Sequence, residues 1–365
     1  PWASRRSLLR SNFPTLLRRG CAVLLCLGLH AAVAQSHTAT RAQDDNTGCA
    51  GCHRNSAMQP ETPMGQALEV GSDNPVLAAH PRLTFHLGAY TWTVETKNGA
   101  STYTVTDGRQ TLTLPIHWAF GAGAQTWVFE RDGKFYESLV SYYPAENALG
   151  ITTGDEHLRP QTLEQAMGRE LTMTDTKLCF GCHSTGAIAG HRLALNSLHP
   201  GITCEHCHRG SLDHAQDAAV ADFSTAPARL RDMSAESMSN FCGECHRSWE
   251  TVVRNGWRGI GNVRFQPYRL ANSRCFNGTD PRISCIACHN PHQDLVRDDL
   301  FYDSKCLACH APTAKPTSTG KAKVCPVSTS KCVSCHMPKT TLPGGHLHFT
   351  DHQIRIVRAG EKFPD

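Results

Sequence analysis

Hydrophobic and polar residues alternate along much of the stretch between residues 83 and 143. Leu83, Phe85 and Leu87 begin the pattern, and a period of two is typical of strands with one buried face. Two Asp-Gly pairs, Asp107-Gly108 and Asp132-Gly133, interrupt the alternation as hairpin turns do. We therefore expect an antiparallel sheet over about 83–143. Further positions in the pattern are Tyr90, Trp92, Val94, Tyr103, Val105, Leu112, Leu114 and Ile116, and strands are expected at 127–130 and 135–142.

Helical spacing of apolar residues begins beyond the expected sheet. Leu163 and Met167 start a pattern that predicts a helix from 163 to about 172. Ser234 precedes another such pattern, and a serine there is a common helix N-cap. A further short helix is expected near Trp249. The fold class predicted from these patterns is α+β, with short helices, a small antiparallel sheet and little other regular structure.

The first 34 residues have the composition of a secretion signal. Five arginines precede an apolar run that ends in Ala32-Val33-Ala34, which is typical of a cleavable signal peptide. The run is too short to cross a bilayer comfortably, and nothing else in the sequence approaches the length of a transmembrane helix. We expect cleavage after Ala34 and a mature chain, without a transmembrane segment, in the periplasm or outside the cell.

The charge of the chain argues against nucleic acid as a partner. The formal charge is +4, but residues 1–34 hold five arginines and no acid, so the remainder carries −1. The remaining Lys and Arg residues are scattered among acids, whereas binding to phosphates needs a basic stripe. The sequence therefore predicts no nucleic-acid function.

Cysteine and histidine are unusually frequent, with 18 Cys and 21 His in 365 residues. Most of the cysteines belong to one repeated motif, Cys-x-x-Cys-His, which occurs seven times. In chain order the motifs are Cys49, Cys52 and His53; Cys179, Cys182 and His183; Cys204, Cys207 and His208; Cys242, Cys245 and His246; Cys285, Cys288 and His289; Cys306, Cys309 and His310; and Cys332, Cys335 and His336.

The motif has the spacing of covalent haem attachment. Two thiols three residues apart can each bond to one vinyl group of a haem, and the adjoining His then becomes the proximal iron ligand. Zinc ribbons and disulfide frameworks also use paired cysteines, but neither requires a His after every second Cys. We therefore expect about seven haem c groups, and short helices packed around stacked haems in place of an apolar core.

The positions of the motifs suggest a division of the chain. One motif stands alone near the N-terminus, no motif occurs from 54 to 178, and six follow before residue 337. The expected segments are a signal peptide (1–34), a first haem-binding segment (35–82), a β-rich segment without haem (83–145) and a six-haem cytochrome domain (146–365).

Two cysteines remain outside both the motifs and the signal segment. Cys275 and Cys325 would close a loop around two haem sites if they formed a disulfide, as pairs of thiols often do in an oxidising compartment. Two separate free thiols are the alternative, because spacing alone does not show that they meet.

Histidine is abundant enough to give every iron a second, distal ligand. His214 and His292 follow the proximal ligands His208 and His289 closely, and each is expected either to ligate iron or to hydrogen-bond a haem propionate. The further candidates are His348 and His352 near the C-terminus, His80 in competition with Met64 for the first haem, and His199 and His191 for the haems at Cys179 and Cys204.

Several motifs resemble one known family. The segments Gly201-Ile-Thr-Cys204-Glu-His-Cys207-His208 and Cys285-Ile-Ala-Cys288-His289-Asn-Pro-His292 are similar to multihaem cytochromes of the cytochrome c-552/4 domain group. The resemblance covers about 175–355 and the first motif. It implies a periplasmic electron carrier with stacked and perpendicular haem pairs, and it implies distal ligation by His214 and His292.

The sequence thus favours an exported multihaem cytochrome that transfers electrons to and from redox partner proteins, which it does not identify, and no catalytic residue is expected. Related folds include nitrite and hydroxylamine enzymes, so an oxidoreductase acting on a small nitrogen or sulfur compound at one open haem iron is the alternative. The chain lacks the Cys-x-x-Cys-Lys motif of many nitrite reductases, although Tyr142, Tyr143 or Tyr268 could neighbour an open iron. An oligomer or extracellular haem filament is a third arrangement.

Overall fold

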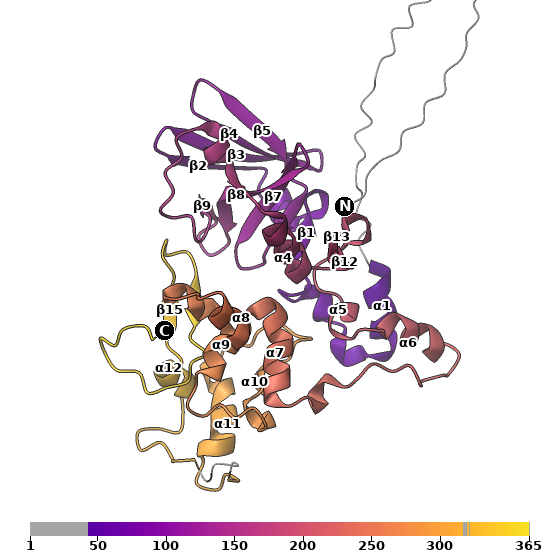
Figure 1. Cartoon of the computed structure of the whole chain (residues 1–365), viewed down its shortest axis with the longest axis vertical. Coiled ribbons are helices and arrows are strands. Elements are labelled where there is room, and N and C mark those ends of the chain that lie inside the picture. The colour runs from indigo at the N-terminus through magenta and orange to yellow at the C-terminus, as the bar shows by residue number, and fades with distance from the viewer. Residues whose placement is uncertain (1–42, 317–319, 321, 365) are drawn as a thin grey trace, which may run out of the picture. The chain divides into compact units, whose positions relative to one another are not determined.

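The computed structural model describes residues 43–316, 320 and 322–364, so the expected signal peptide lies outside the described residues. Within them the chain combines short helices with small antiparallel sheets, which confirms the expected α+β class (Figure 1). None of the helices in this part of the chain is both long and apolar enough to cross a membrane.

Two antiparallel sheets occupy residues 68–170. One has the order β2-β3-β4-β5, and the other has the order β1-β6-β7-β8-β10, with β9 paired to β8. The predicted limits of 83–143 are therefore too narrow, because short strands before and after them pair with β6 and β8. The strands are β1 (Leu68–Val70), β2 (Arg82–Leu87), β3 (Tyr90–Lys97), β4 (Ala100–Thr106), β5 (Thr111–Pro115), β6 (Trp118–Phe120), β7 (Gln125–Arg131), β8 (Lys134–Tyr143), β9 (Ala148–Ile151) and β10 (Gly168–Glu170).

The hairpin turns follow from residues that tolerate a positive φ. Asp132 and Gly133 join β7 to β8 with φ angles of 53° and 72°, as a tight two-residue turn requires. At the other predicted turn, the Asp107 carboxylate accepts hydrogen bonds from the backbone N–H groups of Arg109 and Gln110 at 2.8 and 2.7 Å. Both Asp-Gly turns of the sequence are thus present.

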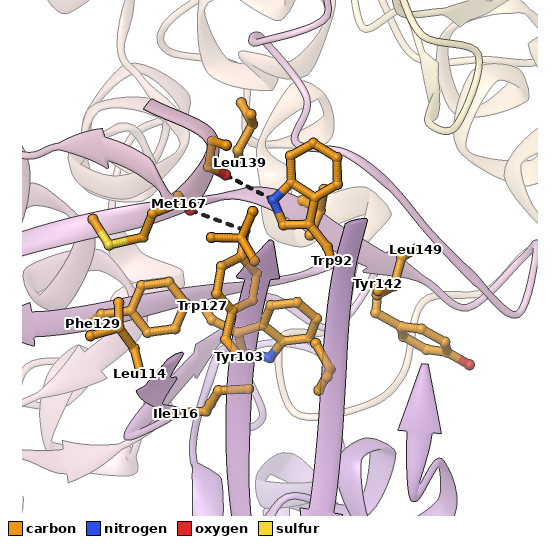
Figure 2. Packing of buried hydrophobic residues seen from close by; sticks show 14 of the residues in the cluster. Trp92, Tyr103, Leu114, Ile116, Trp127, Phe129, Leu139, Tyr142, Leu149 and Met167 are labelled. Atoms are coloured by element: carbon orange, nitrogen blue, oxygen red, sulfur yellow. Dashed lines mark hydrogen bonds between the residues drawn. The ribbon is translucent and has the colours of Figure 1, made fainter. Parts of the chain in front are cut away.

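Large aromatic side chains form the core of the sheet region (Figure 2). Trp92 and Tyr103 are fully buried, and each such side chain contributes about 2 kcal/mol through burial. The Trp92 Nε1–H donates to the carbonyl oxygen of Ala166 at 2.8 Å, and the Tyr103 hydroxyl donates to that of Met167 at 3.0 Å. These two bonds fasten the helix α3 (Leu163–Met167) to the sheets.

The helix predicted for 163–172 is wrong beyond Met167. Gly168 has a φ of 155°, and a Cβ atom there would lie 1.9 Å from the carbonyl oxygen of Glu137. Only a residue without a side chain lets the chain approach β8 so closely, so the helix stops and β10 begins. The apolar spacing gave no sign of this, because Leu171, the next apolar residue of the pattern, is buried as well.

Most other elements are short and lie after residue 172, in the part of the chain that holds six of the seven motifs. Its later portion is coloured from salmon to yellow in Figure 1. The predicted helix after Ser234 is confirmed, and the Ser234 side chain caps it. The helices are α1 (Gln43–Cys52), α2 (Pro75–Ala79), α4 (Met173–His183), α5 (Cys204–Cys207), α6 (Ser211–Ala218), α7 (Ala235–His246), α8 (Trp249–Arg254), α9 (Gln266–Ala271), α10 (Cys285–Cys288), α11 (Asp299–His310) and α12 (Cys332–His336). The short strands are β11 (Ser184–Thr185), β12 (Ile188–Ala189), β13 (Arg192–Leu193), β14 (His199–Pro200), β15 (Lys339–Thr341) and β16 (His348–Thr350).

The apolar core is unevenly distributed along the chain. The two clusters of buried apolar side chains lie between Leu68 and Leu198. From 203 onward the described chain contributes few buried apolar residues, Met238, Val252 and Val263 among them. A region with so few apolar contacts needs another source of buried surface, which the haems expected from the motifs would supply.

Candidate haem centres

Each Cys-x-x-Cys-His motif lies at the C-terminal end of a helix. The motif's His is the last residue of α4, α7, α11 and α12, and it directly follows α1, α5 and α10. Side chains at positions i, i+3 and i+4 of a helix share one face. The two thiols and the imidazole of each motif therefore lie on the same side, as attachment to one haem requires.

The cysteines of the motifs differ in exposure. Cys52 and Cys335 are exposed, whereas the others, Cys309 among them, are half-buried. Cys309 is the last residue but one of α11, and Cys335 holds the same position in α12. The Cys335 sulfur lies 3.9 Å from the Ser334 hydroxyl oxygen. These positions fit the expected haem attachment, which stays a prediction. The half-buried motif cysteines are Cys49, Cys179, Cys182, Cys204, Cys207, Cys242, Cys245, Cys285, Cys288, Cys306, Cys309 and Cys332.

Three proximal histidines are oriented by backbone carbonyl groups. The Nδ1 atoms of His183, His310 and His336 lie 2.8 Å from the carbonyl oxygens of Ala67, Lys323 and Arg355 respectively. A protonated Nδ1 that donates to a carbonyl fixes the tautomer and leaves the Nε2 lone pair available, which is the usual support of a metal-ligating imidazole.

Burial keeps several of these imidazoles neutral, the form that ligates iron. It lowers the pKa of four of the motif histidines below the usual value, since the charged form loses its water. For His352 the same effect, opposed by a hydrogen bond to Thr350, leaves the pKa at about 4. The other histidines of the site whose pKa is lowered mainly by burial are His183, His208, His246, His289 and His292.

Three proximal histidines face a second histidine across a gap of similar width. Two imidazoles on opposite sides of one metal ion, with metal–nitrogen bonds of about 2.0 Å, have ring centres about 6 Å apart. The observed gaps therefore suit one iron atom each. The pairs are His53 with His214 at 6.5 Å, His208 with His292 at 6.1 Å, and His289 with His352 at 6.1 Å.

The histidines that face the proximal candidates come from segments that follow other motifs. His214 lies six residues after the third motif yet faces His53 of the first, and His292 lies three residues after the fifth motif yet faces His208 of the third. Sequence spacing predicted both residues as ligands but did not reveal which iron each would serve. The histidine pairs thereby connect the first motif to the third, and the third to the fifth.

The helix that carries His214 is capped by a residue of the third motif. The Glu205 carboxylate accepts hydrogen bonds from the backbone N–H groups of Gly210 and Ser211 at 2.8 and 2.9 Å. Burial acts to raise the pKa of Glu205, but these bonds and one from the Ser211 hydroxyl outweigh it and lower the pKa. Glu205 is one of the variable positions inside Cys-x-x-Cys, and no pattern in the sequence predicts a role for it.

The seventh motif is held by a similar carboxylate. Both oxygens of Asp303, in α11, accept backbone N–H groups at the start of α12, from Lys331 at 2.7 Å and from Cys332 at 2.8 Å. The bond from Cys332 is the main cause that lowers the pKa of Asp303. The helix of the sixth motif thus positions that of the seventh, and no spacing in the sequence signals this contact.

Other candidate ligands have different surroundings. Both ring nitrogens of His80 have partners, Nδ1 the carbonyl oxygen of Val76 at 2.8 Å and Nε2 the Asn147 side chain at 2.7 Å. His348 is exposed, and its Nδ1 lies 2.8 Å from the Thr341 hydroxyl. Their geometry therefore favours His214 over His80 for the first iron. The remaining candidates are placed as follows: His191 is exposed, Met64 and His199 are half-buried, and His199 lies in β14.

The tyrosines considered as neighbours of an open iron have other contacts. The Tyr142 hydroxyl donates to the Asn147 side chain at 2.9 Å, and that of Tyr143 donates to the carbonyl oxygen of Ile151 at 2.6 Å. Both residues belong to β8, and Tyr268 is buried in α9. Their positions give the open-iron alternative no support.

Cys275 and Cys325 are separate free thiols in the structure. The Cys325 sulfur accepts hydrogen bonds from the backbone N–H groups of Val327 and Ser328, which lower the pKa of its thiol. Of the two possibilities left open by the sequence, the structure therefore has the unlinked one.

Cysteines of different motifs also lie in contact. Pairs of their side chains approach one another across motifs, so the expected points of haem attachment lie close together. Three of the four contacts coincide with packed helices, α1 on α5, α7 on α10, and α11 on α12. The pairs are Cys49 with Cys204, Cys182 with Cys245, Cys242 with Cys285, and Cys306 with Cys332.

One part of the chain matches a known protein family. Residues 145–209 match the family model described as cytochrome c554 and c-prime, a segment that includes the second and third motifs. The match supports a c-type cytochrome. Such a cytochrome carries covalent haem and transfers electrons, and the paired thiols and imidazoles of both motifs fit that cofactor. No curated protein and no solved structure matches the chain.

Proposed function

We propose that the chain is an exported, periplasmic or extracellular, multihaem cytochrome that transfers electrons through seven covalently bound haems. The observation that carries the proposal is the set of three histidine pairs, each a proximal ligand facing a second His at 6.1–6.5 Å. Two strong axial ligands suit electron transfer because they leave the iron no vacant position for a substrate.

Bound haem supplies a one-electron couple at each motif, and the protein's part is to fix the spacing and the ligands. The cysteine contacts join the first motif to the third, the second to the fourth, the fourth to the fifth and the sixth to the seventh. The packing of α10 on α11 adds the fifth to the sixth.

The pair of His208 with His292 joins the two remaining groups of motifs, the third to the fifth. An exposed ion pair adds a second connection. Arg209, next to the third motif, pairs with Glu244 inside the fourth at 3.5 Å. All seven motifs thereby belong to one connected set, which favours electron transfer along the chain over seven isolated sites.

The haem count is the first test of this proposal. Protein secreted by a host with cytochrome c maturation is denatured, and intact mass spectrometry is combined with haem quantitation on the same sample. Seven haems that stay attached after denaturation are expected, with removal of residues 1–34. A mass without covalent haem would contradict the proposal. So would a total of two haems, both attached within residues 145–209.

A further inference from the structure

A buried ion-pair network lies between the fifth and seventh motifs. Arg269 and Asp351 are each 0% exposed. Nε and Nη2 of Arg269 donate to the two carboxylate oxygens of Asp351 at 2.8 and 2.9 Å, and Arg355 donates to the same carboxylate at 2.6 Å. Because a buried charge is costly without its partner, removal of Arg269 would disturb everything that Asp351 anchors.

The C-terminal segment contributes further contacts to Arg269. Its guanidinium donates to the carbonyl oxygen of Pro364 at 2.7 Å and to the Gln353 side chain at 2.7 Å, and it lies 4.3 Å from the centre of the Phe363 ring. Arg269 therefore fastens the chain from 351 to 364 onto α9, the helix in which it lies.

The start of this segment contains the histidine that faces His289 of the fifth motif. His352 directly follows Asp351, and its ring faces His289 at 6.1 Å. Its Nδ1 donates to the carbonyl oxygen of Thr350 at 2.9 Å, and its own carbonyl oxygen accepts the Ser273 hydroxyl at 3.1 Å. The ring direction of His352 thus depends on the backbone that Asp351 anchors.

Three residues farther on, Arg355 of the same segment hydrogen-bonds His336, the expected proximal ligand of the seventh motif. The carbonyl oxygen of Arg355 accepts the Nδ1–H of His336 at 2.8 Å, and the backbone N–H of Arg355 donates to the carbonyl oxygen of His336 at 3.2 Å. The Arg355 side chain returns to Asp351. The buried Asp351 carboxylate therefore supports two imidazoles, that of His352, which faces the fifth motif, and that of His336 in the seventh.

We propose that Arg269 is a positioning residue for two haem irons at once. By clamping Asp351 it holds His352 as the distal ligand of the fifth haem, and through Arg355 it holds His336 as the proximal ligand of the seventh. The inference rests on the proposed function, because the two imidazoles act as ligands only where haem is attached.

The test compares Arg269→Met with the wild type as fully loaded proteins, by electron paramagnetic resonance and redox titration. Met fills much of the arginine's volume but leaves the carboxylate without its main partner. We expect haem content to stay at seven, while two of the seven haems change their spectrum and midpoint potential. Arg269→Lys should restore part of both changes, since it returns a positive charge without the fork of donors.

Arg254→Met is the matched control, because Arg254 pairs with Glu250 on the exposed surface of α8 and should leave all seven haems unchanged. Arg355→Met keeps the pair of Arg269 with Asp351 and should alter the seventh haem alone. It decides the question if Arg269→Met does not fold.

Unchanged spectra and potentials in folded Arg269→Met, or equal shifts at all seven haems, would overturn the inference. For Arg355→Met, an unchanged seventh haem would do so. A wild-type protein without covalent haem would instead overturn the proposed function, so the two failures are distinguishable.

Discussion

An imidazole that ligates iron needs one nitrogen free and the other held, and the structure shows how single residues meet this need. Carbonyl groups hold Nδ1 of His183, His310 and His336. The motif itself predicts these three histidines as proximal ligands. It could not reveal their supports, because any residue can offer a carbonyl group and Ala67, for example, lies 116 positions from His183.

The pairing of His214 with His53 leads to a prediction at a single residue. His214→Met should raise the midpoint potential of one haem, since a Met ligand favours the reduced iron more than a His ligand does. Redox titration of the loaded protein measures the shift. His86→Met is the control, because His86 is exposed on β2 and bonds only the Thr91 hydroxyl among the described residues. An unchanged titration for His214→Met would reduce the pair to a ring contact.

At the scale of elements, local patterns predicted the strands better than the helix ends. Alternation identifies the buried positions of β3 and β4, including Trp92 and Tyr103, because the faces of a strand repeat every two residues. The end of α3 at Gly168 depends instead on the approach to Glu137 of β8. Such an approach is a tertiary contact, which no local period encodes.

Gly201 makes a similarly close approach beside the third motif. Its φ is 73°, and a Cβ atom there would lie 1.8 Å from the carbonyl oxygen of Gly65. Gly201→Ala should therefore lower the free energy of unfolding by clearly more than the about 1 kcal/mol expected for a positive φ alone. Gly88→Ala, with a φ of 60° and no atom within 4 Å of its Cβ, isolates that backbone cost. Equal losses in denaturant unfolding would show that the contact with Gly65 is unimportant.

Burial raises the pKa of Tyr103, which predicts a pH dependence for the sheet region. Above about pH 10 the unfolded chain ionises this tyrosine while the folded chain keeps it neutral, so stability falls as pH rises. Tyr103→Phe should weaken the fall by up to about 1.4 kcal/mol per pH unit. It should also cost about 1 kcal/mol at neutral pH through the lost bond to Met167. Urea unfolding at pH 8 and pH 11 measures both, and identical slopes would contradict the account.

At the scale of the whole molecule, two regions depend on different sources of stability. The apolar clusters lie between Leu68 and Leu198, whereas the chain from 203 onward buries few apolar side chains. The uneven spacing of the motifs predicted this contrast. The connections between motifs could not be predicted in the same way, because residues such as His214, Glu205 and Arg269 act on partners that are distant in sequence or carry no recognisable pattern.

This contrast predicts how the protein behaves without haem. Protein made in the cytoplasm of a host without cytochrome c maturation should lose the structure of the motif-rich region, while the sheets keep their own core. Limited proteolysis with mass spectrometry should then leave a resistant fragment that contains 68–170. Loaded protein is the control and should resist throughout. Equal resistance of the two forms would mean that haem contributes little to the core.

The histidine pairs at the first, third and fifth motifs lead us to propose that every iron has two protein ligands and serves electron transfer. Low-temperature electron paramagnetic resonance of the oxidised protein, recorded before and after addition of nitrite and combined with haem quantitation on the same sample, tests it most directly. We expect seven haems and only low-spin signals that nitrite leaves unchanged. A high-spin signal that nitrite perturbs would contradict the proposal and would identify an open iron at which a small nitrogen compound binds.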